Sequence, residues 1–284
     1  MKEFPRALVA IVTPFARDGE LDRSAHRSNV SMLAARGCGG FVVAGSTGEG
    51  PYLTIDERTS LVTETRAQLP DSYVIAGINA ESTRQALTQI GAAADAGADA
   101  VLVLTPTTLV RGNVDSVTRF YSAVADESGV PVLLYSNPKV TAYELPTSAI
   151  SKLAAHPNVA GIKDSGGDPT RIDDIASEIE AGFVVYPGAS RALLASAQKG
   201  AYGAITASAN YVYPLVAGAA AGEADAQRSL DAVIAVVEQH GIAGAKAAAE
   251  AAGLQAGSPR APLTPVSDAG RSEIRVAVAN AQQH

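Results

Sequence analysis

Eight short apolar runs, each followed by a segment with helical spacing, constrain the fold of this 284-residue chain more than any other feature. Each run is nearly continuous in apolar residues, which is typical of parallel strands that helices cover on both faces. Eight strands that alternate with helices are what a closed (β/α)8 barrel requires. The sequence therefore predicts strands at Ala7–Val12, Gly40–Ala44, Tyr73–Ile78, Ala100–Leu104, Val130–Tyr135, Val159–Lys163, Phe183–Tyr186 and Gly203–Thr206.

Two of the intervening segments carry clear helix boundaries. Thr54–Leu69 begins with a T-x-x-E capping box, in which Thr54 and Glu57 each accept a hydrogen bond from the other residue's backbone amide. Glu81–Ala96 is followed by Gly97, a residue type that often ends helices because it adopts the left-handed conformation at little cost. Both segments are therefore predicted to be helices.

The last part of the chain has helical patterns without strands. The α/β alternation ends near residue 210, and helices are predicted at Glu223–Gln239, Ile242–Ala252 and Asp268–Gln282. We predict an α/β fold in which residues 1–210 form a (β/α)8 TIM barrel and residues 211–284 form a C-terminal helical extension of the same domain. A doubly wound open sheet is the alternative. It usually has a Gly-rich loop after the first strand, where this chain has Thr13-Pro14-Phe15, so we favour the barrel.

Composition and charge weigh against several classes of function. The formal net charge is −7 and no long run of Lys or Arg is present, so a nucleic-acid partner is not expected. No stretch approaches the roughly 18 apolar residues of a membrane helix, and no signal peptide is recognised. Cys38 is the single cysteine, so no internal disulfide is possible, and we predict a cytoplasmic protein. The four histidines lack metal-ligand spacing and no nucleotide-binding motif is present, which predicts neither a metal nor a cofactor.

A lysine at the end of a buried strand is the most unusual candidate residue. Lys163 ends the sixth predicted strand, within the stretch GIKDSGGD. Burying an unpaired ammonium is costly, and the same desolvation lowers the pKa of the amine and frees it to attack a carbonyl. The alternative is a structural salt bridge to Asp164 or Asp168. We favour the nucleophile.

Other strand ends carry polar side chains that a barrel would bring to the same rim. Gly45-Ser46-Thr47-Gly48-Glu49-Gly50 follows strand two, and its hydroxyls and backbone amides suit a carboxylate, although a tight turn with capping hydroxyls fits equally well. Tyr135 ends strand five and could transfer protons, but a tyrosine at the rim of an apolar core is the commoner explanation for one such residue. The small residues of Thr206–Asn210 form a weaker candidate for a pocket wall.

These motifs together resemble the dihydrodipicolinate synthase / N-acetylneuraminate lyase family, over nearly the whole chain. The resemblance rests on Gly45–Glu49, Tyr135-Ser136-Asn137-Pro138 and Gly161-Ile162-Lys163-Asp164 at specific separations. It implies a barrel with a C-terminal helical extension, usually a homotetramer. It also implies a lyase whose lysine forms an imine with pyruvate or a related 2-oxo acid.

The resemblance implies a role for each matched residue. Lys163 would be the Schiff-base lysine, Tyr135 the proton shuttle beside it, and Thr47 a further catalytic residue. The hydroxyls of Ser46 and Thr47 would hold the carboxylate of the 2-oxo acid. Gly188 and Ile205 would line the pocket through their backbones. The substrate-binding residues would be Ser46, Thr47, Ser165, Gly188 and Ile205.

Within the family, several stretches are most similar to 4-hydroxy-2-oxoglutarate aldolases. They are GEGPYLT, LPTSAISKLAAHPN, GIKDSGGDPTRI and PRAPL. In that comparison Ser165 would reach the distal end of the substrate.

The chain departs from the family pattern at two places. Members that condense pyruvate with aspartate semialdehyde usually carry an Arg where this chain has Val140, so the bidentate grip on a second carboxylate is missing, and Lys139 could replace it only loosely. Many members also carry a tyrosine after strand four, where this chain has Thr105-Pro106-Thr107-Thr108-Leu109. We expect Thr107 or Thr108, through water, to replace that phenol. The alternative is that Tyr211 or Tyr213 serves instead.

Three functions follow from the resemblance and these departures. The leading one is a pyruvate-dependent aldolase that cleaves or forms a 4-hydroxy-2-oxo acid such as 4-hydroxy-2-oxoglutarate. The second is a Schiff-base dehydratase of a 3-deoxy-2-oxo sugar acid. The third is a non-catalytic barrel that binds a 2-oxo acid.

Overall fold

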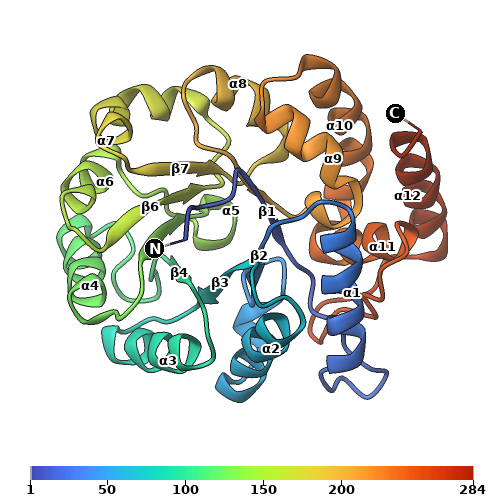
Figure 1. Ribbon diagram of the computed structural model, residues 1–284, viewed down its shortest axis with the longest axis horizontal. Helices are drawn as coiled ribbons and strands as arrows, with labels where there is room; N and C mark the ends of the chain where they lie inside the picture. The colour runs from blue at the N-terminus through green and yellow to red at the C-terminus, as the bar shows by residue number, and fades with distance from the viewer. Residues whose placement is uncertain (1, 284) are drawn as a thin grey trace.

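The computed structural model describes residues 2–283, whose eight strands form one parallel, nearly closed barrel (Figure 1). Neighbouring strands follow the order β7-β6-β5-β4-β3-β2-β1-β8, and β1 pairs with β8. Between β7 and β8 the backbone amide of Tyr202 donates to the carbonyl of Val185 at 2.9 Å. The predicted barrel is confirmed, and the open-sheet alternative is wrong because the first strand pairs with the last. The strands are β1 (Ala7–Ala10), β2 (Gly40–Val43), β3 (Tyr73–Ile78), β4 (Ala100–Leu104), β5 (Val132–Ser136), β6 (Val159–Asp164), β7 (Val184–Pro187) and β8 (Ala204–Thr206).

Side chains on the strands alternate between two apolar layers, because successive residues of a strand point to opposite faces. The outer layer packs against the surrounding helices and includes Val9, Phe41, Val74 and Ile162. The inner layer fills the barrel and consists of Leu8, Ala10, Val42, Tyr73, Ile75, Ala100, Leu102, Leu133, Tyr135, Val184, Tyr186 and Ile205. Only the carboxyl-terminal end of this packed interior is left for a site.

The helices confirm the boundaries that the capping residues predict. In α2 (Ile55–Gln68), Thr54 and Glu57 form the expected capping box. In α3 (Thr83–Asp95), the chain leaves the helix through Gly97, whose φ is +97°. The other helices around the barrel are α1 (Arg23–Ala35), α4 (Val114–Glu127), α5 (Pro138–Thr141), α6 (Thr147–Ala154), α7 (Ala176–Glu180), α8 (Leu193–Gln198) and α9 (Ala209–Ala220).

Strand β6 contains an irregularity that sets the register of its last residues. Val132 of β5 pairs with Val159 of β6, but the next residue, Leu133, pairs with Gly161. Ala160 is therefore the extra residue of a β-bulge. Beyond the bulge the pairing is regular and places Tyr135 opposite Lys163.

The C-terminal helices pack on one side of the barrel, beside α9 and α1 (Figure 1). They are α10 (Ala224–Val237), α11 (Gly241–Ala251) and α12 (Asp268–Ala281), close to the predicted ranges. The division of the chain into residues 1–210 and 211–284 stays a prediction, although α9 runs across position 210. Among the described residues, no helix is both long enough and apolar enough to cross a membrane.

Candidate active site

Lys163 points into the barrel at the carboxyl end of β6 and is only 5% exposed. Its neighbour Ile162 belongs to the outer layer, so the alternation of the strand turns Lys163 inward. It lies in register between Tyr135 of β5 and Tyr186 of β7, and its Nζ is 4.6 Å from the centre of the Tyr135 ring. The site is therefore an amine held among apolar and phenolic groups.

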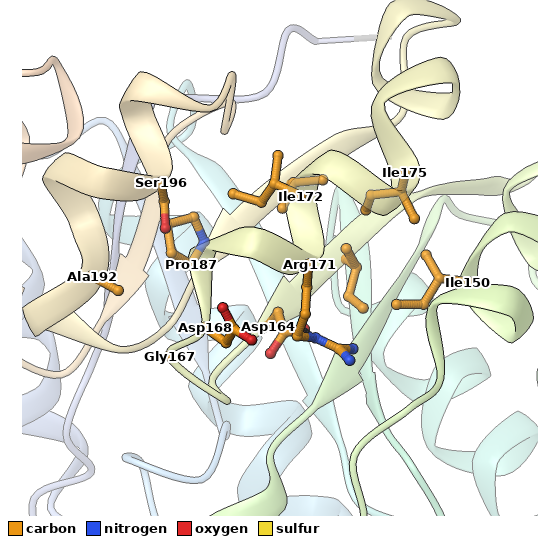
Figure 2. Close-up of a pocket in the computed structure, with 12 residues that line it drawn as sticks. Ile150, Asp164, Gly167, Asp168, Arg171, Ile172, Ile175, Pro187, Ala192 and Ser196 are labelled. Atoms are coloured by element: carbon orange, nitrogen blue, oxygen red, sulfur yellow. Dashed lines mark hydrogen bonds and ion pairs between the residues drawn. The ribbon is translucent and has the colours of Figure 1, made fainter.

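The acidic residues beside Lys163 in the sequence face away from it. Asp164 lies on the outer face of β6, where its carboxylate accepts a hydrogen bond from Nε of Arg171 at 2.9 Å (Figure 2). Asp168 caps the segment that follows, and its carboxylate accepts hydrogen bonds from Thr170. Lys163 forms no ion pair within residues 2–283. The salt-bridge alternative for Lys163 is therefore wrong, because Asp164 points to the opposite side of the sheet and Asp168, which lies beyond the strand, binds Thr170 instead.

A second buried lysine, Lys246 of α11, also lies near this end of the barrel, and the sequence interpretation missed it. Its ammonium donates to the carbonyl of Thr13 at 2.8 Å, to the Glu49 carboxylate at 2.8 Å and to the carbonyl of Ser258 at 2.9 Å. All three of its N–H bonds are used, so it is not available as a nucleophile. The available signal was a single lysine within the Ala-rich stretch Gly244–Ala252.

Tyr135 is 4% exposed, and its phenol accepts a hydrogen bond from the side-chain amide of Asn137 at 2.8 Å. Burial raises the pKa of Tyr135, but the Lys163 ammonium and the surrounding hydroxyl and amide groups lower it by more, so the pKa lies below its ordinary value. Such a phenol is suited to proton transfer. Asn137 lies within the YSNP motif, but its residue type and position alone do not distinguish it as a functional residue.

The loop after β2 brings Ser46 and Thr47 to the same pocket. Arg58 of α2 holds the loop from behind, because its guanidinium donates to the carbonyls of Ala44 at 3.0 Å and Gly50 at 2.9 Å. The Ser46 hydroxyl is buried and lies close enough to the Tyr135 phenol to lower its pKa, but it makes no hydrogen bond of ordinary geometry within residues 2–283. A buried, unpaired hydroxyl in a pocket is suited to a polar ligand group.

Ser46, Thr47, Tyr135, Lys163, Ser165 and Gly188 all line one cavity of about 850 Å³. Gly188 fits closely, since a Cβ there would lie 2.8 Å from Cε of Lys163 and would also strike the Ser165 hydroxyl. Ile205 is fully buried in the inner layer of the barrel, and its side chain does not line the cavity. The structure thus brings together every predicted site residue except Ile205, which was expected to line the pocket through its backbone and is not among the residues that line this cavity. The described residues contain no group of three or more metal-ligating His, Cys, Asp or Glu side chains.

The residues expected to replace the strand-four tyrosine do not reach this cavity in the single chain. The backbone amides of Thr107 and Thr108 donate to the Glu81 carboxylate at 3.0 Å and 2.8 Å, and Thr107 lines a neighbouring pocket. Of the alternative tyrosines, Tyr211 lines the cavity, whereas the Tyr213 hydroxyl lies 3.5 Å from the carbonyl of Ala7, at the start of β1. Burial raises the pKa of Tyr211, which makes it less suited to proton transfer than Tyr135.

The similarity to known proteins extends over both the barrel and the C-terminal helices. Residues 3–281 match the Dihydrodipicolinate synthetase family. The 4-hydroxy-tetrahydrodipicolinate synthase 1 of Streptomyces coelicolor is 35% identical over 272 residues, which cover 92% of this chain and 88% of that protein. The 4-hydroxy-tetrahydrodipicolinate synthase of Acidiphilium cryptum is 32% identical over 288 residues, with 97% of each chain covered. The crystal structure of the chloride-inhibited dihydrodipicolinate synthase from Acinetobacter baumannii, complexed with pyruvate, has a TM-score of 0.88 at 30% identity and covers 97% of this chain and 98% of that one.

Proposed function

Because the chain belongs to the dihydrodipicolinate synthetase family of pyruvate-dependent lyases, we propose that Lys163 is the residue that forms the imine with the 2-oxo acid. The chain is thus a class I, Schiff-base carbon–carbon lyase. The choice of Lys163 is supported by its inward position and by its freedom from ion pairs within residues 2–283. An amine in such a place is held with little hydration and is free to attack a carbonyl.

The surrounding groups fit the steps that an imine requires. The hydroxyls of Ser46 and Thr47 hold the carboxylate, which fixes the 2-oxo group against the amine. Tyr135 carries protons to and from the reacting carbons and the departing water. Ser165 and Gly188 line the cavity beside Lys163. A backbone contribution from Ile205, within β8, stays a prediction, because Ile205 is not among the residues that line the cavity.

We further propose that the substrate is a 4-hydroxy-2-oxo acid such as 4-hydroxy-2-oxoglutarate. Its 2-oxo group condenses with Lys163 and loses water, and the protonated imine then accepts the electron pair of the C3–C4 bond as that bond breaks. The 4-hydroxyl group gives up its proton and becomes the aldehyde of glyoxylate. Protonation of C3 and addition of water then release pyruvate and the free lysine, so the reaction needs no oxidant or reductant.

The observation that carries this substrate assignment is Val140 of α5, which is 56% exposed and lines the cavity beside Lys139. An aliphatic side chain there cannot grip a second carboxylate as a guanidinium would. Lys163 is used by the imine, and Arg191, the third cation among the described residues of the cavity wall, is paired with Glu238 at 2.8 Å. The flexible ammonium of Lys139 and the Ser165 hydroxyl therefore remain for the distal carboxylate.

Condensation of pyruvate with aspartate semialdehyde is the second candidate. It is favoured by the names of the relatives, which are 4-hydroxy-tetrahydrodipicolinate synthases. The same Val140 opposes it.

A substrate panel with detection of pyruvate tests the assignment. We expect the chain to cleave 4-hydroxy-2-oxoglutarate, whose distal carboxylate Lys139 and Ser165 would hold, with a higher kcat/KM than it condenses aspartate semialdehyde. The guanidinium pair that Val140 lacks would contribute about 3 kcal/mol to that condensation, or about 10²-fold in kcat/KM. Val140→Arg is the matched variant, and it should raise the condensation activity. A wild-type chain that condenses aspartate semialdehyde efficiently would overturn the substrate assignment. A dioxo acid formed with loss of water would instead identify a dehydratase, and pyruvate capture without any turnover would identify a binding protein.

We also propose that the chain assembles as a homotetramer. The Ala-rich C-terminal stretch is one apolar surface that subunits could share, but on α11 most of it is already buried within one chain. A groove between α10 and α12 is open and lined by both apolar and polar side chains, and its apolar residues include Val236 and the 61% exposed Val276. Sedimentation at micromolar concentration should therefore show a tetramer. A monomer under those conditions would count against this assembly.

A further inference from the structure

A buried ion pair connects the C-terminal helices to the loop that carries Ser46 and Thr47. Nζ of Lys246 lies 2.8 Å from Oε1 of Glu49, and their side chains are 1% and 0% exposed. Both partners are fully satisfied, since Lys246 has three acceptors and the second carboxylate oxygen of Glu49 accepts the backbone amide of Arg260 at 2.7 Å. A buried pair is tolerated only when its hydrogen bonds are complete, so its geometry is tightly defined.

The pair joins segments that are far apart in the sequence. Thr13 follows β1, Glu49 follows β2, and Ser258 and Arg260 precede α12. The Lys246 ammonium and the Arg260 guanidinium also lie 4.6 Å and 4.1 Å from the centre of the Phe15 ring. The ends of two neighbouring strands are therefore held by groups from the C-terminal part of the chain.

The connection acts on an unusual point of the loop backbone. Glu49 has a φ of +57°, a left-handed conformation that non-glycine residues rarely adopt. Its amide donates to the carbonyl of Ser46 at 3.1 Å, and the carbonyl of Gly48 accepts the Thr13 hydroxyl at 2.6 Å. A displacement of the Glu49 backbone would therefore also displace Ser46, which it binds, and Thr47, which lies between them in the loop. Neither Glu49 nor Lys246 lines the cavity itself.

We propose that Lys246 and Glu49 are positioning residues for the 2-oxo acid carboxylate. They act through the loop, by holding the hydroxyls of Ser46 and Thr47 at the distance from Lys163 at which the carboxylate and the 2-oxo group are bound together. This inference rests on the proposed roles of Lys163 and Thr47, but it does not depend on which aldehyde the enzyme uses. The C-terminal helices then have a function in substrate binding as well as in packing.

Borohydride capture of pyruvate, measured as a function of pyruvate concentration, separates positioning from simple stability. Glu49→Gln keeps the size of the side chain and removes its charge, and Glu49→Gln combined with Lys246→Met removes both charges. We expect the half-saturating pyruvate concentration to rise about 10-fold or more in both variants, because small displacements of a binding group are costly. The rate at saturating pyruvate should change far less, since Lys163 and Tyr135 are untouched.

Two controls make the result specific. Arg271→Gln breaks a half-exposed ion pair to Glu250 between α12 and α11, 2.9 Å long, and should leave pyruvate capture unchanged. Thr47→Val should raise the half-saturating concentration by itself, and adding it to Glu49→Gln should cost less than the product of the two separate effects, because both act on one contact. If the two fold-changes multiplied, or if Glu49→Gln had the half-saturating pyruvate concentration of the wild-type chain, the positioning role would be overturned. If the wild-type chain itself captured no pyruvate on Lys163, the proposed function would fail, and this inference with it.

Discussion

Lys163→Ala is expected to abolish both turnover and the covalent capture of pyruvate by borohydride. Lys246, the other buried lysine among the described residues, cannot replace it, because all three of its N–H bonds are engaged. Without the imine, the C–C bond has no electron sink, and the reaction falls to the rate of substrate bound without covalent activation. Peptide mass mapping after reduction should place the wild-type adduct on Lys163.

Lys139→Ala is the matched control for this result. Lys139 also lines the cavity, so its loss should weaken substrate binding at most and leave the adduct on Lys163. An adduct on Lys139 or Lys246, or none in the wild-type chain, would contradict the assignment. Chelators should leave the activity unchanged, because the imine takes the part that a metal plays in class II aldolases.

Tyr135→Phe should have the next largest effect, a decrease in kcat of roughly 10²–10⁴-fold, as expected for a positioned acid–base group. The substitution keeps the ring that packs beside Lys163 and removes only the hydroxyl that Asn137 binds. Imine formation and cleavage both need a proton carrier at this place. Single-turnover kinetics should therefore show the loss in the chemical steps, with KM affected much less.

Other hydroxyls test whether Tyr135 is the proton carrier. Tyr211→Phe, Thr107→Val and Thr108→Val should each cost far less than Tyr135→Phe. The pKa of Tyr211 is raised by burial, and the two threonines lie outside the cavity of the single chain. Nearly full activity in Tyr135→Phe together with an inactive Tyr211→Phe would show that Tyr211 is the carrier.

The fold was predictable because its signals are local. Continuous apolar runs predicted all eight strands to within one or two residues at each end, since buried parallel strands leave few polar positions. Capping residues predicted helix boundaries because each of them binds backbone groups within one helical turn. The extent of α9 across residue 210 was not foreseen.

The site was predictable only in part because its remaining contacts are long-range. Lys163 could be identified from its strand, but the direction in which it points depends on the sheet register. The amide of Asn137 and the pairing of Lys246 with Glu49 depend on tertiary packing, the latter across 197 positions of sequence. The expected role of Thr107 and Thr108 stays a prediction, because in the single chain Glu81 binds their backbone amides and neither residue lines the cavity.

The bulge at Ala160 has a consequence for how this enzyme can change during evolution. The residues from Gly161 to Asp164 are in regular pairing, so losing or gaining one residue there would exchange the inward lysine for the outward carboxylate of Asp164. A change of length before Gly161 falls where the ladder is already interrupted, and the strand can absorb it without turning Lys163. Insertions and deletions should therefore accumulate on the amino-terminal side of the bulge, and the four residues that follow it should keep a constant length.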